Sequence, residues 1–173
     1  MSALDRLIRV IPDWPSQGVT FQDLTGVLAD AQGLREVSQE LALPYSHQGI
    51  DVVAGMEARG FIVGAAVARQ LDVGFIALRK AGKLPGIVHS ATYALEYGTA
   101  TLQVHQEDVK PGMKVLIIDD VLATGGTARA AAQLIESGGA EVVGFGFILT
   151  LDFLGGVEKI SNYPIHTLRT IYA

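Results

Sequence analysis

The stretch Val115-Leu116-Ile117-Ile118-Asp119-Asp120-Val121-Leu122-Ala123-Thr124-Gly125-Gly126-Thr127 decides the fold of this 173-residue chain. It contains an apolar run rich in β-branched residues, two adjacent acids, a loop of small residues and the start of an alanine-rich segment. The pattern predicts a buried strand over 114–118 and a helix over 127–137. A strand joined to a helix in this way is typical of α/β proteins, which bind ligands at the carboxyl ends of their parallel strands.

The small-residue loop has the chemistry of a phosphate site. Gly125 and Gly126 permit backbone angles and close approaches that side chains would block. Successive N–H groups in the loop, together with the positive end of the following helix, favour an anion. Thr124 and Thr127 add hydroxyl donors, and Thr127 is also in position to cap the helix. We therefore expect the loop from Ala123 to Thr127 to bind a phosphate.

The two acids indicate what else the ligand carries. Carboxylates beside a phosphate site would repel the phosphate, so Asp119 and Asp120 are expected to accept hydrogen bonds from ribose hydroxyls or to help hold a magnesium ion. A sugar that carries a phosphate fits both halves of the segment. The alternative is a plain strand–turn–helix connection, which needs neither the acids nor the threonines. Two other nucleotide motifs, G-x-x-x-x-G-K-[ST] and G-x-G-x-x-G, are absent from the sequence.

The rest of the chain alternates between strand and helix patterns. Apolar runs predict strands over 50–54, 74–78, 141–149 and 165–171, and helical patterns cover 4–10, 34–43 and 61–71. Residues 79–89 predict a long loop, and 92–95 with 100–105 predict a hairpin or flap. This order predicts one α/β domain over 1–173, with a central, mostly parallel sheet flanked by helices.

Composition excludes several classes of protein. The chain is 49% hydrophobic and 18% charged, which predicts a folded chain with a sizeable core. Its net charge of -5 argues against general nucleic-acid binding, and its apolar runs are too short to cross a membrane. The absence of cysteine excludes disulfides and thiol chemistry and fits a cytoplasmic protein. Residues 58–95 contain five basic residues and one acid. Two interpretations of this segment are open: a pocket for an anionic ligand, or a basic face exposed to solvent.

The segment over 115–127 resembles the phosphoribosyl pyrophosphate signature of the type I phosphoribosyltransferases. The resemblance implies that Asp119 and Asp120 contact the ribose diol, and that residues 123–127 bind its 5′-phosphate. Four further segments are similar to adenine phosphoribosyltransferases, in the order and spacing of that family. They are Gly18-Val19-Thr20-Phe21-Gln22-Asp23, Glu57-Ala58-Arg59-Gly60-Phe61, Arg79-Lys80-Ala81-Gly82-Lys83-Leu84-Pro85-Gly86 and Leu95-Glu96-Tyr97-Gly98.

The resemblance implies roles for basic residues in binding pyrophosphate. Glu57, Ala58 and Arg59 resemble the family's pyrophosphate loop, so a strained or cis peptide bond is expected between Glu57 and Ala58. The guanidinium of Arg59 would grip phosphate oxygens. The loop that carries Arg79, Lys80 and Lys83 resembles the family's flexible catalytic loop, whose charges would neutralise the leaving group. Arg59 and Lys83 are therefore candidate catalytic residues.

The same resemblance implies how adenine is held. Phe21 would stack on the base, backbone groups around Thr20 and Gln22 would read its edge, and Leu151 would close the other face. Glu96 would manage the proton at N7 as N9 attacks, and it is the third candidate catalytic residue. Two residues depart from the family pattern: Gln22 stands where many members have arginine, and Ala81 where others have proline or arginine.

The activity implied is the transfer of the phosphoribosyl group to adenine, giving AMP and pyrophosphate in purine salvage. Mg²⁺ would be held mainly by substrate and water, near Asp119 and Asp120, with no direct protein ligand expected. The resemblance also implies a homodimer, a base-binding hood over about 1–33 and a flap over about 79–105. Two alternatives stay open: a base other than adenine, and a regulator that senses phosphoribosyl pyrophosphate. The regulator would need an added DNA-binding domain, for which we expect no room before Leu4.

Overall fold

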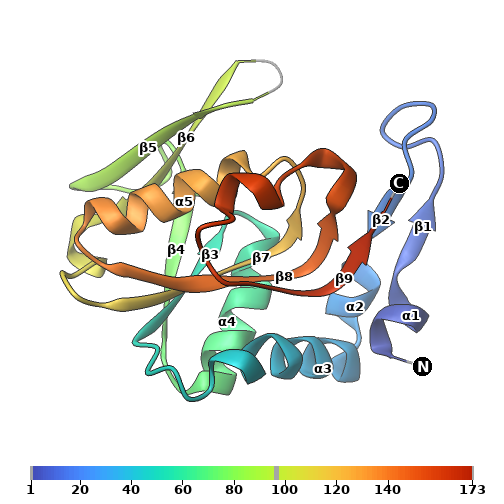
Figure 1. Ribbon diagram of the computed structural model, residues 1–173, viewed down its shortest axis with the longest axis horizontal. Helices are drawn as coiled ribbons and strands as arrows, with labels where there is room; N and C mark the ends of the chain where they lie inside the picture. Colours follow the sequence, from blue (N-terminus) through green and yellow to red (C-terminus); the bar gives the residue numbers. More distant parts are fainter. Residues whose placement is uncertain (1, 96–97, 173) are drawn as a thin grey trace.

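A seven-stranded sheet dominates the part of the chain that the computed structural model describes, residues 2–95 and 98–172 without the side chain of Ala3. Its strand order is β5-β6-β4-β3-β7-β8-β9 (Figure 1). The strands are β3 (Val52–Met56), β4 (Gly74–Lys80), β5 (Val88–Ala94), β6 (Thr99–His105), β7 (Lys114–Leu122), β8 (Glu141–Leu151) and β9 (Ile165–Ile171).

The centre of the sheet is parallel. β3 pairs in parallel with both β4 and β7, β7 pairs with β8, and β8 pairs with β9. The hairpin β5–β6 extends this sheet through an antiparallel pairing of β6 with β4. The predicted mostly parallel sheet and the predicted hairpin are both confirmed.

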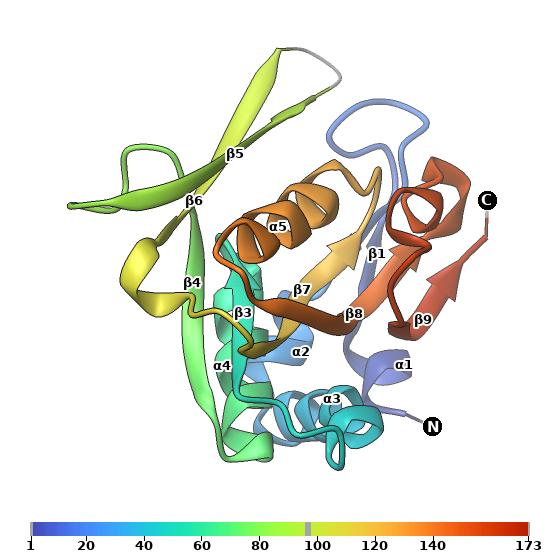
Figure 2. The same cartoon turned by 60° about the vertical axis from the view of Figure 1, so that its left-hand side comes forward.

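Helices cover both faces of the sheet. α5 (Gly126–Ser137) lies on one face, while α3 (Ala31–Ala42) and α4 (Arg59–Leu71) lie on the other (Figure 2). The ends of the helices follow local chemistry: the Asp30 side chain accepts from the N–H of Gly33 at the start of α3, and Asp72 in the left-handed conformation ends α4. Short 3₁₀ turns occupy Leu43–Tyr45, Gln106–Asp108, Asp152–Leu154 and Val157–Ile160.

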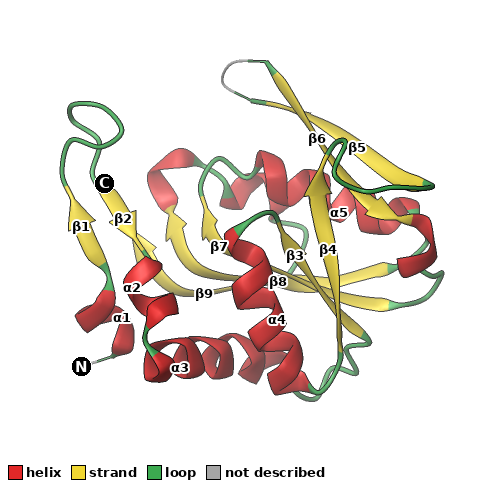
Figure 3. Cartoon of the chain, turned by 180° about the vertical axis from the view of Figure 1, so that it is seen from behind, coloured by secondary structure: helices red, strands yellow, loops and turns green. Residues whose placement is uncertain are grey.

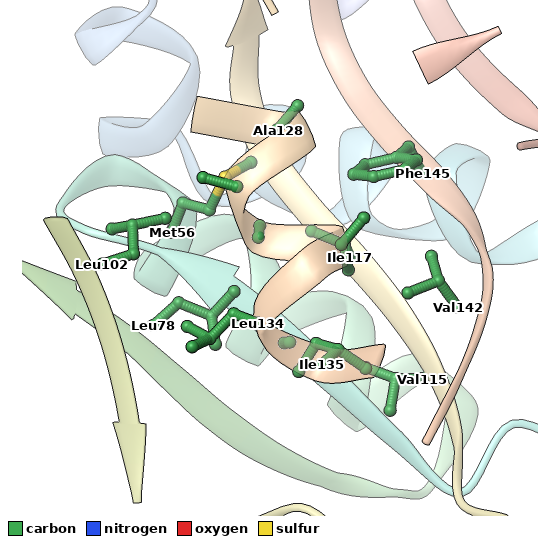
Figure 4. Close-up of a cluster of buried hydrophobic side chains, with 14 of the residues drawn as sticks. Met56, Leu78, Leu102, Val115, Ile117, Ala128, Leu134, Ile135, Val142 and Phe145 are labelled. Atoms are coloured by element: carbon green, nitrogen blue, oxygen red, sulfur yellow. The ribbon is translucent and has the colours of Figure 1, made fainter. Parts of the chain in front are cut away.

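Alternation along the strands builds two cores. Val115 and Ile117 of β7 pack beneath α5, whereas Leu116 and Ile118 pack on the side of α3 and α4. Figure 4 shows the first core, where Leu134 and Ile135 of α5 meet side chains from the strands. Neighbouring residues of β7 thus face different layers, and this holds the strand in a fixed position.

The N-terminal region differs from its prediction. The helix predicted over 4–10 ends earlier, as α1 (Ala3–Leu7), because Arg9–Ile11 forms strand β1, which pairs with β2 (Phe21–Asp23). A short helix, α2 (Thr25–Ala29), follows. An ion pair between Asp5 and Arg169 ties α1 to β9. Figure 3 shows β1 and β2 standing beside the end of β9.

Two predicted boundaries are also wrong. β7 does not stop at Ile118 but continues to Leu122, because Asp119, Val121 and Leu122 pair with residues of β8. The loop predicted over 79–89 is shorter, since Lys80 still belongs to β4 and β5 begins at Val88. No helix in the described ranges is both long and apolar enough to cross a membrane.

Candidate active site

A cavity of about 90 Å³ lies at the carboxyl end of β7. Met56 from β3, Phe147 from β8 and Ala128 from α5 contribute to its wall. Of the seven residues predicted to hold the ribose and its phosphate, five line it, whereas Asp120 and Gly126 do not. The five are Asp119, Ala123, Thr124, Gly125 and Thr127.

A larger hollow of about 260 Å³ lies elsewhere, between the exposed side of α5 and the segment around Tyr163. Its lining includes Arg129, Glu136 and Lys159. We assign the site to the smaller cavity because only there do strand ends, a glycine loop and a carboxylate meet, as ligand sites of parallel sheets require.

The loop before α5 leaves backbone donors free for an anion. Gly125 is the N-cap of α5, with φ of 74°, and no side chain forms a capping hydrogen bond. Thr127 therefore does not cap the helix, contrary to the prediction, because α5 already begins at Gly126. The first N–H groups of a helix have no partner within the helix, so they can bind a phosphate here.

Close backbone packing fixes the shape of this loop. A Cβ added to Gly125 would lie 2.5 Å from the carbonyl oxygen of Gly156 and 2.9 Å from its Cα. The loop after β8 therefore supports the loop after β7, and only glycine fits between them.

The two acids have different surroundings. Asp119 faces the cavity, and its Oδ1 accepts the N–H of Asp120 at 2.9 Å. Burial, together with the neighbouring Asp120 carboxylate, raises the pKa of Asp119 well above its usual value. Asp120 is buried and forms an ion pair with Nε of Arg59. Among the described residues, no well-aligned hydrogen bond reaches Oδ2 of Asp120.

The predicted pyrophosphate loop adjoins these acids. A cis peptide bond joins Glu57 and Ala58, as predicted. α4 begins directly after it, and a Cβ added to Gly60 would lie 2.7 Å from Oδ1 of Asp119. The side chain of Arg59 is 47% exposed despite its ion pair, so its guanidinium can reach a ligand.

The carboxylate of Glu57 holds the start of the basic loop. Its Oε2 accepts the backbone N–H of Lys80 at 2.9 Å and Nε of Arg79 at 3.4 Å. The hydrogen bond from Lys80, followed by that from Arg79, holds the pKa of Glu57 below its usual value. Lys80 and Lys83 are exposed, and neither forms an ion pair with another described residue. Glu57 thus positions Arg79, and the two lysines face solvent.

The residues predicted to bind adenine lie outside the cavity lining. Phe21 pairs with Ile11 across β1 and β2, and its ring lies 4.4 Å from that of Trp14, measured between centroids. Thr20 is exposed, and Gln22 is partly buried in the same strand pair. Leu151 ends β8. Glu96, the predicted proton-handling residue, lies outside the described residues.

Two adjacent carboxylates beside the cavity fit a magnesium ion that is shared with a substrate. No cluster of three or more His, Cys, Asp or Glu side chains able to hold a metal occurs in the described ranges. Asp119 and Asp120 supply adjacent carboxylates beside the loop that leads into α5. Mg²⁺ commonly uses one or two carboxylates with water and substrate phosphates, and these two acids fit that pattern.

Comparisons with known proteins agree with this geometry. Residues 27–169 match the family model described as the phosphoribosyl transferase domain. The adenine phosphoribosyltransferase of Nitrosococcus oceani is 51% identical over 168 residues, which cover 97% of this chain and 98% of that protein. The chain belongs to the adenine phosphoribosyltransferase family. The structure of a family member from Rhodothermus marinus has a TM-score of 0.90 and 44% identity, covering 98% of both chains.

A second solved member of the family carries ligands. The adenine phosphoribosyltransferase of Saccharomyces cerevisiae, complexed with D-2,5-dideoxy-2,5-imino-altritol 1,6-bisphosphate and adenine, has a TM-score of 0.90 and 36% identity. The match covers 96% of each chain. That protein therefore binds a bisphosphate together with adenine on the same fold.

Two residues that contact the loop before α5 were not predicted from the sequence. Gly156 packs against Gly125 in this loop, and the Tyr93 hydroxyl accepts a hydrogen bond from Oγ1 of Thr127 at 3.3 Å. The adjacent glycines at 155–156 were a signal in the sequence for the role of Gly156. The sequence contained no such signal for Tyr93, because its partner Thr127 lies 34 positions away.

Proposed function

We propose that this chain transfers the 5-phosphoribosyl group from phosphoribosyl pyrophosphate to N9 of adenine, giving AMP and pyrophosphate in purine salvage. One observation carries the proposal: a carboxylate and the uncapped N-terminus of α5 line the same cavity at the end of β7. The N-terminus of the helix can bind a phosphate, and the carboxylate can accept a hydrogen bond from a ribose hydroxyl. The names of the relatives supply the base and the reaction.

The loop residues fix the sugar in this proposal. The N–H groups of residues 124–127 and the hydroxyls of Thr124 and Thr127 bind the 5′-phosphate. Asp119 accepts a hydrogen bond from a ribose hydroxyl, and the adjacent carboxylate of Asp120, whose Oδ2 is paired with Arg59, accepts another. Ribose held at two ends keeps its anomeric carbon in place for attack, which lowers the entropic part of the barrier.

Basic residues stabilise the leaving group. The exposed guanidinium of Arg59 binds pyrophosphate oxygens. Arg79, which is held in place by its ion pair with Glu57, binds them as well. Lys80 and Lys83 add charge from the loop beyond β4. When bound, Mg²⁺ would add further neutralisation of the pyrophosphate oxygens, with Asp119 and Asp120 as candidate protein partners. These charges act on a transition state in which positive charge develops on the sugar.

The hood supplies the base site in this scheme. Phe21 stacks on adenine with Trp14 beside it, the backbone at Thr20 and Gln22 reads the ring edge, and Leu151 closes the opposite side. A site built to accept a hydrogen bond from the 6-amino group leaves buried groups unpaired when a 6-oxo base enters. Glu96 handles the proton at N7 during attack by N9.

The wider assignments belong to the same proposal. The chain acts as a homodimer, as its resemblance to the adenine phosphoribosyltransferases implies. The hood spans about 1–33 and the flap about 79–105 of a single domain. The cysteine-free composition is compatible with a reducing compartment such as the cytoplasm.

The direct test mixes purified protein with phosphoribosyl pyrophosphate, Mg²⁺ and one base at a time, and measures nucleotide by chromatography. We expect AMP from adenine and far less product from guanine or hypoxanthine. A parallel reaction with excess chelator should lose the activity, which tests the magnesium requirement separately. Preference for a 6-oxo base would refute the assignment of adenine as the substrate. The absence of product with every base would refute the proposal that the chain is a phosphoribosyltransferase.

A further inference from the structure

The β5–β6 hairpin is in direct contact with the first turn of α5. Tyr93 lies on β5 opposite Ala100 of β6, and its hydroxyl accepts a hydrogen bond from Oγ1 of Thr127 at 3.3 Å. A Cβ added to Gly126 would lie 3.4 Å from Cδ2 of Tyr93 and 3.5 Å from the carbonyl oxygen of Ala94. The tyrosine ring therefore packs on the helix turn, and its hydroxyl reaches a residue that lines the cavity.

The hydrogen count of these hydroxyls constrains what happens when a phosphate binds. Each hydroxyl has one hydrogen to donate and two lone pairs that can accept. Thr127 gives its hydrogen to Tyr93 in this structure. A phosphate dianion only accepts, so the hydroxyl of Thr127 can donate to it only by turning its hydrogen away from Tyr93. Tyr93 is then free to donate its own hydrogen to Oγ1 of Thr127.

We infer that Tyr93 is a positioning residue for the 5′-phosphate. The Tyr93–Thr127 hydrogen bond persists but reverses direction, so that a chain runs from the tyrosine hydroxyl through Thr127 to the phosphate. This inference rests on the proposed function, which puts a 5′-phosphate at the start of α5. It adds a residue of the hairpin to the site, one that acts through Thr127 and does not touch the ligand.

The chain of donors strengthens binding in a way that can be measured. Hydrogen bonds in a chain polarise one another, and those to a charged acceptor are the stronger kind. Loss of the Tyr93 hydroxyl should therefore weaken AMP binding about 3- to 10-fold, the range for one hydrogen bond. The phosphate is bound equally in ground and transition states, so the KM for phosphoribosyl pyrophosphate should rise while kcat stays nearly constant.

The experiment compares Tyr93→Phe with wild type in AMP titration calorimetry and in steady-state kinetics. Phenylalanine keeps the ring that packs on Gly126 and removes only the hydroxyl. Tyr172→Phe is the matched control, because Tyr172 is 72% exposed at the end of the chain. A double-mutant cycle adds Thr127→Val with and without Tyr93→Phe, to test whether the tyrosine acts through Thr127.

The inference predicts weaker AMP binding in Tyr93→Phe, unchanged binding in Tyr172→Phe, and no further loss when Tyr93→Phe is added to Thr127→Val. AMP binding as tight as that of wild type, or tighter, in Tyr93→Phe would overturn the inference. It would also be overturned if Tyr93→Phe weakened AMP binding as much in the Thr127→Val variant as in wild type. A fall in kcat with constant KM would also overturn it, because the hydroxyl would then serve the chemical step. Wild-type protein that neither binds nor forms AMP would overturn the proposed function itself.

Discussion

Replacing Gly125 by alanine perturbs the loop before α5 at the point where it packs against Gly156. Gly125 has φ of 74°, where a non-glycine residue costs about 1–2 kcal/mol. The added Cβ would lie 2.5 Å from the carbonyl oxygen of Gly156, whereas ordinary contact begins near 3.4 Å. The two backbones must then separate by roughly 1 Å, and a misplacement of that size costs about 100-fold in rate.

Gly112→Ala provides the matched control. Gly112 has φ of 78°, but a Cβ there meets no atom within 4 Å. Both variants carry the same backbone cost, which should lower Tm by about 2–8 °C in a chain of this size. Only Gly125→Ala has the steric overlap beside the cavity.

The assay measures kcat/KM for phosphoribosyl pyrophosphate, and Tm by circular dichroism, for both variants. We expect Gly125→Ala to lose about 100-fold in kcat/KM and more stability than the control. Gly112→Ala should keep its kcat/KM within about 2-fold of wild type, since it leaves the site geometry intact. If Gly125→Ala retained wild-type kcat/KM, the contact with Gly156 would not shape the site, and the reasoning would be refuted.

Three other variants test separate parts of the account. Asp119→Asn should raise the free energy of unfolding at pH 7, because folding raises the pKa of Asp119 and the ionised carboxylate therefore destabilises the folded state. In urea unfolding, this gain should disappear as the pH falls toward about 4, where the carboxyl group becomes protonated in both states. The same change should lower kcat/KM about 10- to 100-fold, and a less stable Asp119→Asn at pH 7 would contradict the burial argument. Glu96→Gln should lower kcat about 100-fold with little change in the affinity for phosphoribosyl pyrophosphate, and equal losses in both would exclude its proton role. Tyr45→Phe removes a buried hydroxyl that donates to the carbonyl oxygen of Phe145 at 2.9 Å; it should cost about 1–3 kcal/mol of unfolding free energy and leave kcat/KM unchanged, and an unaltered urea midpoint would count against it.

Local chemistry was enough to predict the strand, loop and helix at the centre of this protein. The apolar run before Asp119 is short and rich in β-branched residues, and the segment after Gly126 is rich in alanine. The glycines between them need no distant partner to be recognised. The parallel sheet followed from the alternation of such units.

The errors occur where contacts between distant segments decide the structure. β7 runs on to Leu122 because β8 pairs with it, and its own sequence does not contain that information. The pair β1–β2 escaped prediction because its residues are exposed or only partly buried, so no hydrophobic alternation marks the strands. Gly156 and Tyr93 meet the phosphate loop through contacts between segments far apart in the chain.

A crystal structure with AMP tests the central assignment most directly. It should contain the phosphate within hydrogen-bonding distance of the N–H groups at the start of α5, with the ribose hydroxyls on Asp119 and Asp120. A phosphate bound on Lys80 and Lys83 instead, with the α5 turn empty, would contradict it.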